Sequence, residues 1–334
     1  MPRNLKLRSV AQGLILVLMI LLVVGTASPG AVAARPSSGQ EIRIAGQFGL
    51  VYAPLMVAKE KKIFEKYGLE PVWKEFGSGA AVREALISGD VDVGFMGIPP
   101  FLIGWDKGLP WKVALGFNVV PVGLVTYDPD IKSLKDLKPT DKIAVPSPGS
   151  VQDIILAMAA ERQLGNPKAF EKQLVAMPHP DAAAALISKK GIAAHFTTPP
   201  YLFEELEQPG FHEILNHRQA FGKDFSFNVG VVAQRFHDSR PSAYTAMVKS
   251  INESMAIINQ NPREVAQLLA PEFGLPAEKL YKYLTWPGMN FTSTPYGLME
   301  FAVFMQKAGF TKKIPHSLDE IVWENMLAVM GGEK

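Results

Sequence analysis

From residue 41 onward, short β-like runs alternate with amphipathic helical runs, and this alternation restricts the fold more than any other sequence feature. The pattern predicts strands at 41–45, 72–76, 91–96, 113–118, 142–145 and 192–196. Between and after them it predicts helices at 53–67, 80–87, 99–105, 151–164, 182–187 and 200–206. Such alternation is typical of a mostly parallel sheet with helices on its faces. The sequence therefore predicts an α/β fold.

Two stretches of the chain are similar to each other at an offset of 100 residues. Residues 85–102 and 185–202 share seven of 18 positions, where average composition would give about one. Each reads as a helix, a strand and a Pro-Pro-aromatic helix start. Coincidence between two amphipathic helices and two proline pairs remains an alternative explanation. The repeat favours two lobes that share one local plan.

After about residue 241 the strand pattern stops and only helices are predicted, at 244–259, 262–269, 277–284, 296–308 and 318–330. Pro262 and Pro295 each suit a first helical position, and Ser317 with Glu320 suits a capping box. We expect lobe 1 to comprise residues 41–120 and 228–334, including this helical extension, and lobe 2 to comprise residues 121–227.

Two similar segments could connect the lobes. Residues 117–125 and 225–232 both contain Phe-Asn-Val followed by a glycine, and they contribute Asn118 and Asn228. Their positions, one after each lobe, suit two hinge strands. A cleft between two α/β lobes is the default ligand site, so both asparagines are candidate ligand contacts.

The N-terminus reads as a secretory signal peptide spanning residues 1–33. Three basic residues precede an apolar run of eleven residues, 14–24, and small residues follow, with cleavage expected after Ala33 or Ala34. Eleven residues are short for a membrane span, which needs about 20, although an uncleaved anchor is the alternative. We expect an exported protein, located in the periplasm.

Composition and motifs argue against most enzyme classes. The chain has no cysteine, which excludes thiol catalysis and cysteine-ligated metal sites. A net charge of +2 gives no basic surplus for nucleic acid. His212 and His217 are spaced too far apart for a zinc helix, and Asp90 with Asp92 reads as a solvated turn rather than a catalytic pair. We expect no catalytic residues, no cofactor and no metal.

Turns between predicted strands and helices are rich in small and hydroxyl residues. In a parallel sheet these turns lie together at the carboxyl ends of strands, where α/β folds bind ligands. Helix N-termini there favour anions, although helix capping alone could explain the hydroxyl groups. The candidate ligand-binding residues are Ser78, Gly79, Gly97, Ile98, Ser147, Gly149, Ser150, Thr197 and Thr198.

No lysine or arginine falls within these turns, so an anion would be held by neutral dipoles unless Arg218 or Lys223 reaches in. A small neutral or aromatic solute fits equally well, because aromatic side chains could stack on it. The candidates for stacking are Phe48, Tyr52, Phe101, Tyr201 and Trp286.

Several motifs, in their order and spacing, resemble the periplasmic solute-binding proteins of ABC importers. The chain is similar to the nitrate/sulfonate/taurine type, which also contains binders of thiamine-pyrimidine precursors. The resemblance covers essentially residues 41–330 and is carried by residues 54–69, 77–79, 85–94, 133–138, 149–150 and 228–232.

The resemblance implies a type II periplasmic-binding-protein-like fold: two similar α/β lobes joined by two hinge strands, with a C-terminal helical extension. It adds Gln47, Phe48 and Tyr52 to the ligand contacts. It implies a monomer that captures a small anionic or aromatic solute, such as a sulfonate, taurine or nitrate, and delivers it to an importer permease. The alternatives are a thiamine-pyrimidine-related binding protein or enzyme on the same fold, and a ligand-binding partner of a membrane sensor.

Overall fold

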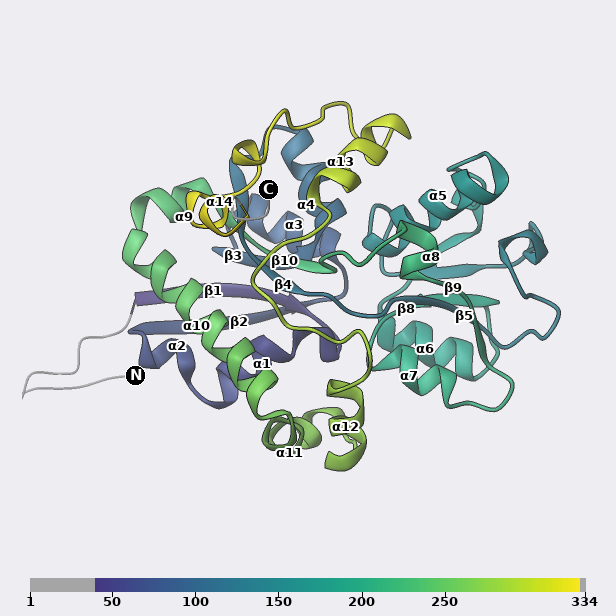
Figure 1. Cartoon of the computed structure of the whole chain (residues 1–334), viewed down its shortest axis with the longest axis horizontal. Coiled ribbons are helices and arrows are strands. Elements are labelled where there is room, and N and C mark those ends of the chain that lie inside the picture. The colour runs from purple at the N-terminus through teal and green to yellow at the C-terminus, as the bar shows by residue number, and fades with distance from the viewer. Residues whose placement is uncertain (1–39, 331–334) are drawn as a thin grey trace, which may run out of the picture. The chain divides into compact units, whose positions relative to one another are not determined.

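The computed structural model describes residues 40–330, in which the strands form two five-stranded sheets (Figure 1). The first sheet has the order β2-β1-β3-β10-β4 and comprises β1 (Gln40–Gln47), β2 (Leu69–Phe76), β3 (Val93–Gly97), β4 (Trp111–Asn118) and β10 (Asn228–Ala233). The second has the order β7-β6-β8-β5-β9 and comprises β5 (Gly123–Thr126), β6 (Ile143–Val145), β7 (Leu174–Ala176), β8 (Ala194–Thr197) and β9 (His212–Asn216). We call each sheet with its helices lobe 1 and lobe 2.

The two sheets share one plan, strand for strand. In lobe 1, β10 pairs antiparallel with both β3 and β4, while β1 pairs parallel with β2 and β3. In lobe 2, β5 pairs antiparallel with both β8 and β9, while β6 pairs parallel with β7 and β8. Each sheet thus has four parallel strands and one antiparallel strand, which lies in a stretch predicted as a hinge. The prediction of two similar α/β lobes is confirmed.

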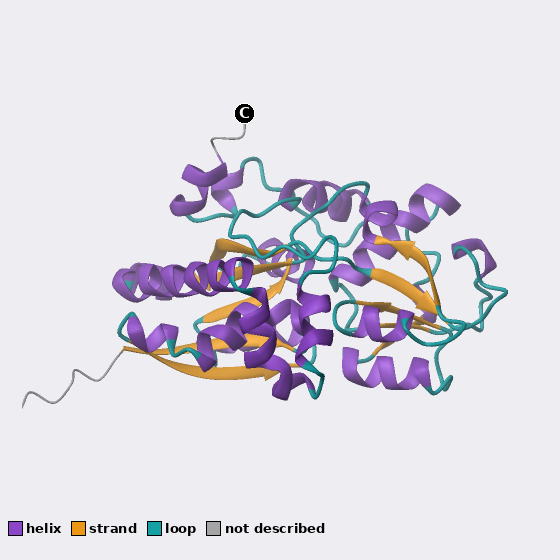
Figure 2. Ribbon diagram, turned by 60° about the horizontal axis from the view of Figure 1, so that its bottom comes forward, coloured by secondary structure: helices purple, strands orange, loops and turns teal. Residues whose placement is uncertain are grey.

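Helices flank the strands of both sheets (Figure 2). Lobe 1 contains α1 (Ala53–Glu60), α2 (Ile63–Lys66), α3 (Gly79–Ser88) and α4 (Ile98–Asp106). Lobe 2 contains α5 (Val151–Leu164), α6 (His179–Ile187), α7 (Tyr201–Leu206) and α8 (His217–Phe221). The C-terminal helices are α9 (Gln234–Ser239), α10 (Pro241–Gln260), α11 (Pro262–Phe273), α12 (Ala277–Leu284), α13 (Leu298–Lys307) and α14 (Glu324–Met330). Short 3-10 turns are η1 (Leu50–Tyr52), η2 (Leu134–Asp136), η3 (Glu171–Gln173) and η4 (Leu318–Glu320).

The C-terminal helical extension is anchored by an apolar stripe on its longest helix. In α10, Met247, Ile251, Met255 and Ile258 are buried at spacings of four, four and three residues, and α10 packs against α1 of lobe 1. This spacing places all four side chains on one helix face. Among residues 40–330, no helix has both the length and the apolar character needed to cross a membrane. The predicted signal peptide lies outside the described residues.

The predicted helix at 53–67 is instead two helices, α1 and α2. Lys62 lies between them in the left-handed conformation, with φ at 51°. This change of backbone direction leaves Ile63 and Phe64 buried. The Phe64 ring packs edge-on against Trp73 of β2, with 5.3 Å between the ring centroids. Core packing of this short segment overrides the continuation of the helix.

Two predicted helices near the C-terminus differ from the structure because the backbone there forms hydrogen bonds with distant residues. Pro295 does not begin α13, since Tyr296 exchanges hydrogen bonds with Ser226 and the helix begins at Leu298. The helix expected at 318–330 is interrupted, because residues 321–323 pair with Val113 at the edge of β4. The expected capping box is absent, and the Ser317 hydroxyl donates to Asp319 instead.

Several short elements were not predicted: β7, β9, α8 and α9. The segment 212–217, weighed above as a zinc helix, forms β9 and the start of α8. β7 has three residues, fewer than the roughly four to eight over which a strand pattern is read, and β9 has one buried residue among its five.

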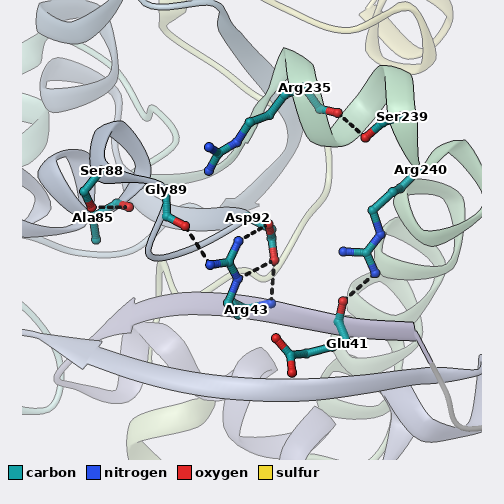
Figure 3. A network of polar contacts seen from close by, with 9 residues as sticks. All are labelled: Glu41, Arg43, Ala85, Ser88, Gly89, Asp92, Arg235, Ser239 and Arg240. Atoms are coloured by element: carbon teal, nitrogen blue, oxygen red, sulfur yellow. Dashed lines mark hydrogen bonds and ion pairs between the residues drawn. The ribbon is translucent and has the colours of Figure 1, made fainter.

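Asp92 does not lie in a solvated turn, as its sequence context suggested, but is buried and pairs with the partly exposed Arg43 (Figure 3). The Arg43 Nη2 and Nε atoms lie 2.7 and 3.0 Å from the two Asp92 carboxylate oxygens, and Nη1 donates to the Gly89 carbonyl at 2.7 Å. The backbone N–H of Arg43 donates to the same carboxylate at 2.9 Å. Asp92 therefore ties the turn after α3 to β1, and Asp90 accepts from Ser88 nearby.

Candidate functional site

A small pocket lies between the two lobes, at the carboxyl ends of their parallel strands. Lobe 1 contributes the turns that follow β1, β2 and β3, and lobe 2 those that follow β6, β7 and β8. The lining residues are Gln47, Phe48, Val51, Tyr52, Gly79, Gly97, Pro100, Pro146, Ser150, Val151, Gln152, His179, Thr198, Phe227 and Asn228.

Four helices begin at this pocket: α3 and α4 from lobe 1, and α5 and α6 from lobe 2. Their first N–H groups have no partner inside the helix and carry partial positive charge. Prolines at the starts of α4 and α6 remove some of these donors. The pocket therefore favours hydrogen-bond acceptors through neutral dipoles.

The side chains at the hinge form one hydrogen-bonded network. Gln47 donates to the Tyr52 hydroxyl at 2.6 Å, and that hydroxyl donates to the Asn228 side-chain oxygen at 3.1 Å. Asn118 accepts from the Asn228 backbone N–H and donates to the Val51 carbonyl. Burial raises the pKa of Tyr52 far above neutral pH, so its hydroxyl stays protonated. The network fixes the point where β4 and β10 pass between the lobes.

Four buried polar atoms at or beside the pocket have no hydrogen-bond partner in the part of the chain that the structure describes. They are the hydroxyl oxygens of Ser147, Thr197 and Thr198 and the side-chain amide nitrogen of Asn228. Leaving a buried polar group unpaired costs about 1–3 kcal/mol. Thr198 and Asn228 line the pocket itself, so a bound polar solute could satisfy them.

The structure brings together most of the predicted site residues. Those that line the pocket are Gln47, Phe48, Tyr52, Gly79, Gly97, Ser150, Thr198 and Asn228. The others do not line it: Asn118 is the last residue of β4, and the same turns contain Ser78, Ile98, Ser147, Gly149 and Thr197.

Helix capping accounts for two of the predicted hydroxyl groups. Ser78 caps α3 by accepting from the Ala81 N–H, and Ser150 caps α5 by accepting from the Asp153 N–H. No reciprocal capping box forms at α5, because the Asp153 carboxylate accepts from the Gly149 N–H, at 2.7 Å, and not from the Ser150 N–H. Ser150 is thus a poor position for testing solute contact, since its substitution would also remove a cap.

Three of the five aromatic candidates do not line the pocket. Phe101 packs near Trp111 in lobe 1, Trp286 stacks on Phe203, and Tyr201 stacks on His179 behind the pocket wall. Among the described residues, the lining contains no lysine, arginine, aspartate or glutamate. Arg218 pairs with Asp224 and Lys223 with Glu300, so neither serves the pocket. No cluster suited to a metal ion occurs within residues 40–330.

Of the polar lining residues, two, Gln152 and His179, were not predicted. The internal repeat could have indicated both residues. At its offset of 100, Tyr52 corresponds to Gln152, Gly79 to His179 and Val51 to Val151. All six of these residues line the pocket. Extending the repeat beyond residues 85–102 would have found both missed side chains.

The lobes approach each other through glycines. A Cβ atom on Gly97 would lie 2.3 Å from a methyl carbon of Val151, and one on Gly149 would lie 2.6 Å from Ile103. At a third point, the Leu50 N–H donates to the Pro199 carbonyl across the cleft at 3.1 Å. These contacts are those of two lobes closed on the pocket.

The family of the chain follows from a match over residues 38–270, which include most of both lobes and nearly all of the pocket described above. The chain belongs to the NMT1-like family. One relative, from Bacillus subtilis (strain 168), bears the name "Putative aliphatic sulfonates-binding protein". It is 28% identical over 262 residues, which cover 76% of each chain.

Solved structures show that this NMT1-like chain has the fold of periplasmic binding proteins. The periplasmic aliphatic sulphonate binding protein of Escherichia coli is 22% identical, with a TM-score of 0.65 and coverage of 86% of this chain and 93% of that one. The periplasmic nitrate-binding protein of Synechocystis PCC 6803 is 18% identical, with a TM-score of 0.70 and coverage of 88% and 89%. At these identities the likeness concerns the fold.

Proposed function

We propose that the protein is an extracytoplasmic solute-binding protein that captures a small organic solute between its lobes and presents it to an ABC importer. The observation that carries the proposal is the set of unpaired buried hydroxyl and amide groups at a pocket between two lobes. The solute-binding names of relatives support the same role.

The proposed solute presents hydrogen-bond acceptors, as a sulfonate, nitrate or carboxylate does. Four helix N-termini and the unpaired hydroxyl groups would orient it, and Phe48 and Phe227 would exclude water. Closure by hinge bending would then give the permease a form to recognise. The proposal includes export through residues 1–33 to the periplasm and action as a monomer.

A thermal-shift screen of residues 35–334 tests the proposal. The panel contains nitrate, taurine, alkylsulfonates, aromatic carboxylates and thiamine-type pyrimidines. A solute at 100 times its dissociation constant adds about 2.7 kcal/mol of stability, which is roughly 5–10 °C in Tm for a chain of this size. A shift from one chemical class names the solute class, and turnover of any compound would overturn a purely binding role. Co-purification with a histidine kinase instead of a permease would favour the sensor alternative.

Thr198→Val is expected to weaken solute binding about tenfold while leaving the Tm unchanged or slightly higher. Valine keeps the shape of threonine and removes a buried hydroxyl that has no partner in the described structure. Thr126→Val is the matched control, because the Thr126 hydroxyl is also buried but donates to the Ala193 carbonyl at 2.8 Å. The control should lower the Tm and leave affinity intact. Equal affinity of wild type and Thr198→Val in calorimetry would remove this hydroxyl from the site.

A further inference from the structure

Four buried side chains form a continuous hydrogen-bonded chain that begins at the pocket and runs into lobe 2. Gln152 Nε2 lies 2.9 Å from His179 Nε2, His179 Nδ1 lies 2.9 Å from His195 Nε2, and His195 Nδ1 lies 2.6 Å from Glu205 Oε1. Gln152 and His179 line the pocket, whereas His195 and Glu205 are fully buried behind it. Capping and sheet pairing do not account for such a chain.

Because each ring nitrogen in this chain either donates or accepts, all three hydrogen bonds must point the same way along the chain. An amide nitrogen only donates, so in the arrangement shown the Gln152 N–H donates to His179 Nε2. His179 then carries its proton on Nδ1 and donates to His195, which carries its own on Nδ1 and donates to Glu205. Glu205 accepts at the end of the chain as a carboxylate.

One proton added to Oε1 of Glu205 reverses every bond, whereas a proton on Oε2 would leave Oε1 an acceptor and the direction unchanged. If Glu205 carries a proton on Oε1, it donates to His195 Nδ1, and the hydrogen of each neutral imidazole moves to Nε2. His179 Nε2 then donates, so the Gln152 amide must turn its carbonyl oxygen toward His179 and leave its NH₂ group facing away. Neither histidine changes its charge. The end of the Gln152 amide that meets a solute is therefore linked to a proton on Glu205, three side chains away.

The surroundings of Glu205 favour the protonated form. Its second oxygen, Oε2, has no partner among the described residues, and burial raises the pKa of Glu205 to about 9. Burial lowers the pKa of His195 to about 3 and that of His179 well below its usual value. The ionisable groups on α7, at its C-cap and on the elements packed against it are His179, Asp181, His195, Tyr201, Glu204, Glu207, His212, Glu213, Glu278, Lys279, Tyr281, Lys282 and Tyr283. Both lysines pair with Glu207, so none of these groups is an unpaired cation that would hold Glu205 ionised.

We infer that His195 and Glu205 are positioning residues of the solute site, which act through His179 to set whether Gln152 offers N–H donors or a carbonyl acceptor to the solute. With Glu205 protonated, the pocket offers donors and selects solutes with acceptor oxygens. This inference rests on the proposed function, but the hydrogen-bond chain can be measured with no solute present.

The test reads the histidine tautomers by NMR of ¹⁵N-labelled protein from pH 6 to pH 10. At pH 7 we expect His179 and His195 both to carry hydrogen on Nε2, and both to convert together to the Nδ1 form above about pH 9. In Glu205→Gln the side chain no longer titrates, so both histidines should keep one and the same tautomer at every pH. Glu204→Gln, an α7 neighbour outside the chain of bonds, is the control and should titrate as wild type.

Two outcomes would overturn the inference: histidines of opposite tautomer at one pH, or wild-type tautomers identical to those of Glu205→Gln up to pH 10. If Glu205→Gln fails to fold, the concerted change in the wild-type protein decides the question alone. A second experiment measures the binding of methanesulfonate. The affinity of the wild-type protein for it should fall at least fivefold between pH 7 and pH 10, and that of Glu205→Gln should stay constant. Failure of methanesulfonate to bind would count against the proposed solute class, but the histidine tautomers would still test the hydrogen-bonded chain.

Discussion

Gly97→Ala should weaken solute binding about 10- to 100-fold without lowering the stability of the solute-free protein. Its Cβ would lie 2.3 Å from a methyl carbon of Val151 on the opposite lobe. Val151 cannot easily rotate away, because a β-branched side chain in a helix has one strongly preferred rotamer. Such overpacking costs about 1–3 kcal/mol, and opening of the lobes relieves it. The substitution therefore destabilises the closed form relative to the open form. Calorimetry with the solute found by the screen would measure the resulting loss of affinity.

A second substitution provides the control for this prediction. Val151→Ala removes the methyl group that meets the new Cβ, so the double variant Gly97→Ala with Val151→Ala should recover most of the lost affinity. Gly97 has φ at −64°, so alanine there introduces no backbone strain. If Gly97→Ala bound the solute as wild type does, the lobes would not close at this point in the bound form.

Asp92→Asn is expected to reduce the free energy of unfolding by about 2 kcal/mol, in line with loss of hydrogen bonds to a charged partner. The Asp92 carboxylate accepts three bonds from Arg43, and its side chain is 9% exposed. The Arg43 side chain is 32% exposed, so solvent screening keeps the loss below that of a fully buried pair. Urea denaturation of both proteins at pH 7 would measure the difference.

The same ion pair predicts a pH dependence. Burial acts to raise the pKa of Asp92, but the hydrogen bonds from Arg43 outweigh it and hold the pKa below its usual value. A lowered carboxyl pKa contributes stability above the unfolded value, about 3.9, and this is lost as pH falls through the folded value. The difference between wild type and Asp92→Asn should shrink at low pH. Asp90→Asn, whose carboxylate accepts from Ser88, should cost about 0.5 kcal/mol or less; a larger loss there than at Asp92 would refute the assignment.

Sequence periodicity predicted most of this fold because long elements carry long patterns. The helix at 151–164 was predicted to the residue, since a cap at Ser150 and a glycine at 165 mark its ends. Periodicity failed where tertiary contacts override local preference, as at Lys62 and at residues 321–323. It also failed for β7, whose three residues are too few to form a pattern.

The missed strand explains one of the two missed side chains. Because β7 was not predicted, the residues after it were not read as a strand-to-helix turn, and His179 was overlooked as the first residue of α6. Gln152 was overlooked because it has neither the hydroxyl group nor the small side chain that marked the other turn residues. Its role depends on His179 and His195, which are 27 and 43 positions further along the chain, and only the folded structure brings these three side chains together.

The late position of β10 in the sequence fixes the order in which the two sheets of a growing chain can be completed. All five strands of lobe 2 lie between residues 123 and 216, so its sheet can be completed as one continuous segment. The sheet of lobe 1 can be completed only later, because β10 at residues 228–233 lies between β3 and β4. Until that strand has been synthesised, the facing edges of β3 and β4 lack the partner that they have in the folded protein. The half of the protein that is made first is thus the half that matures last.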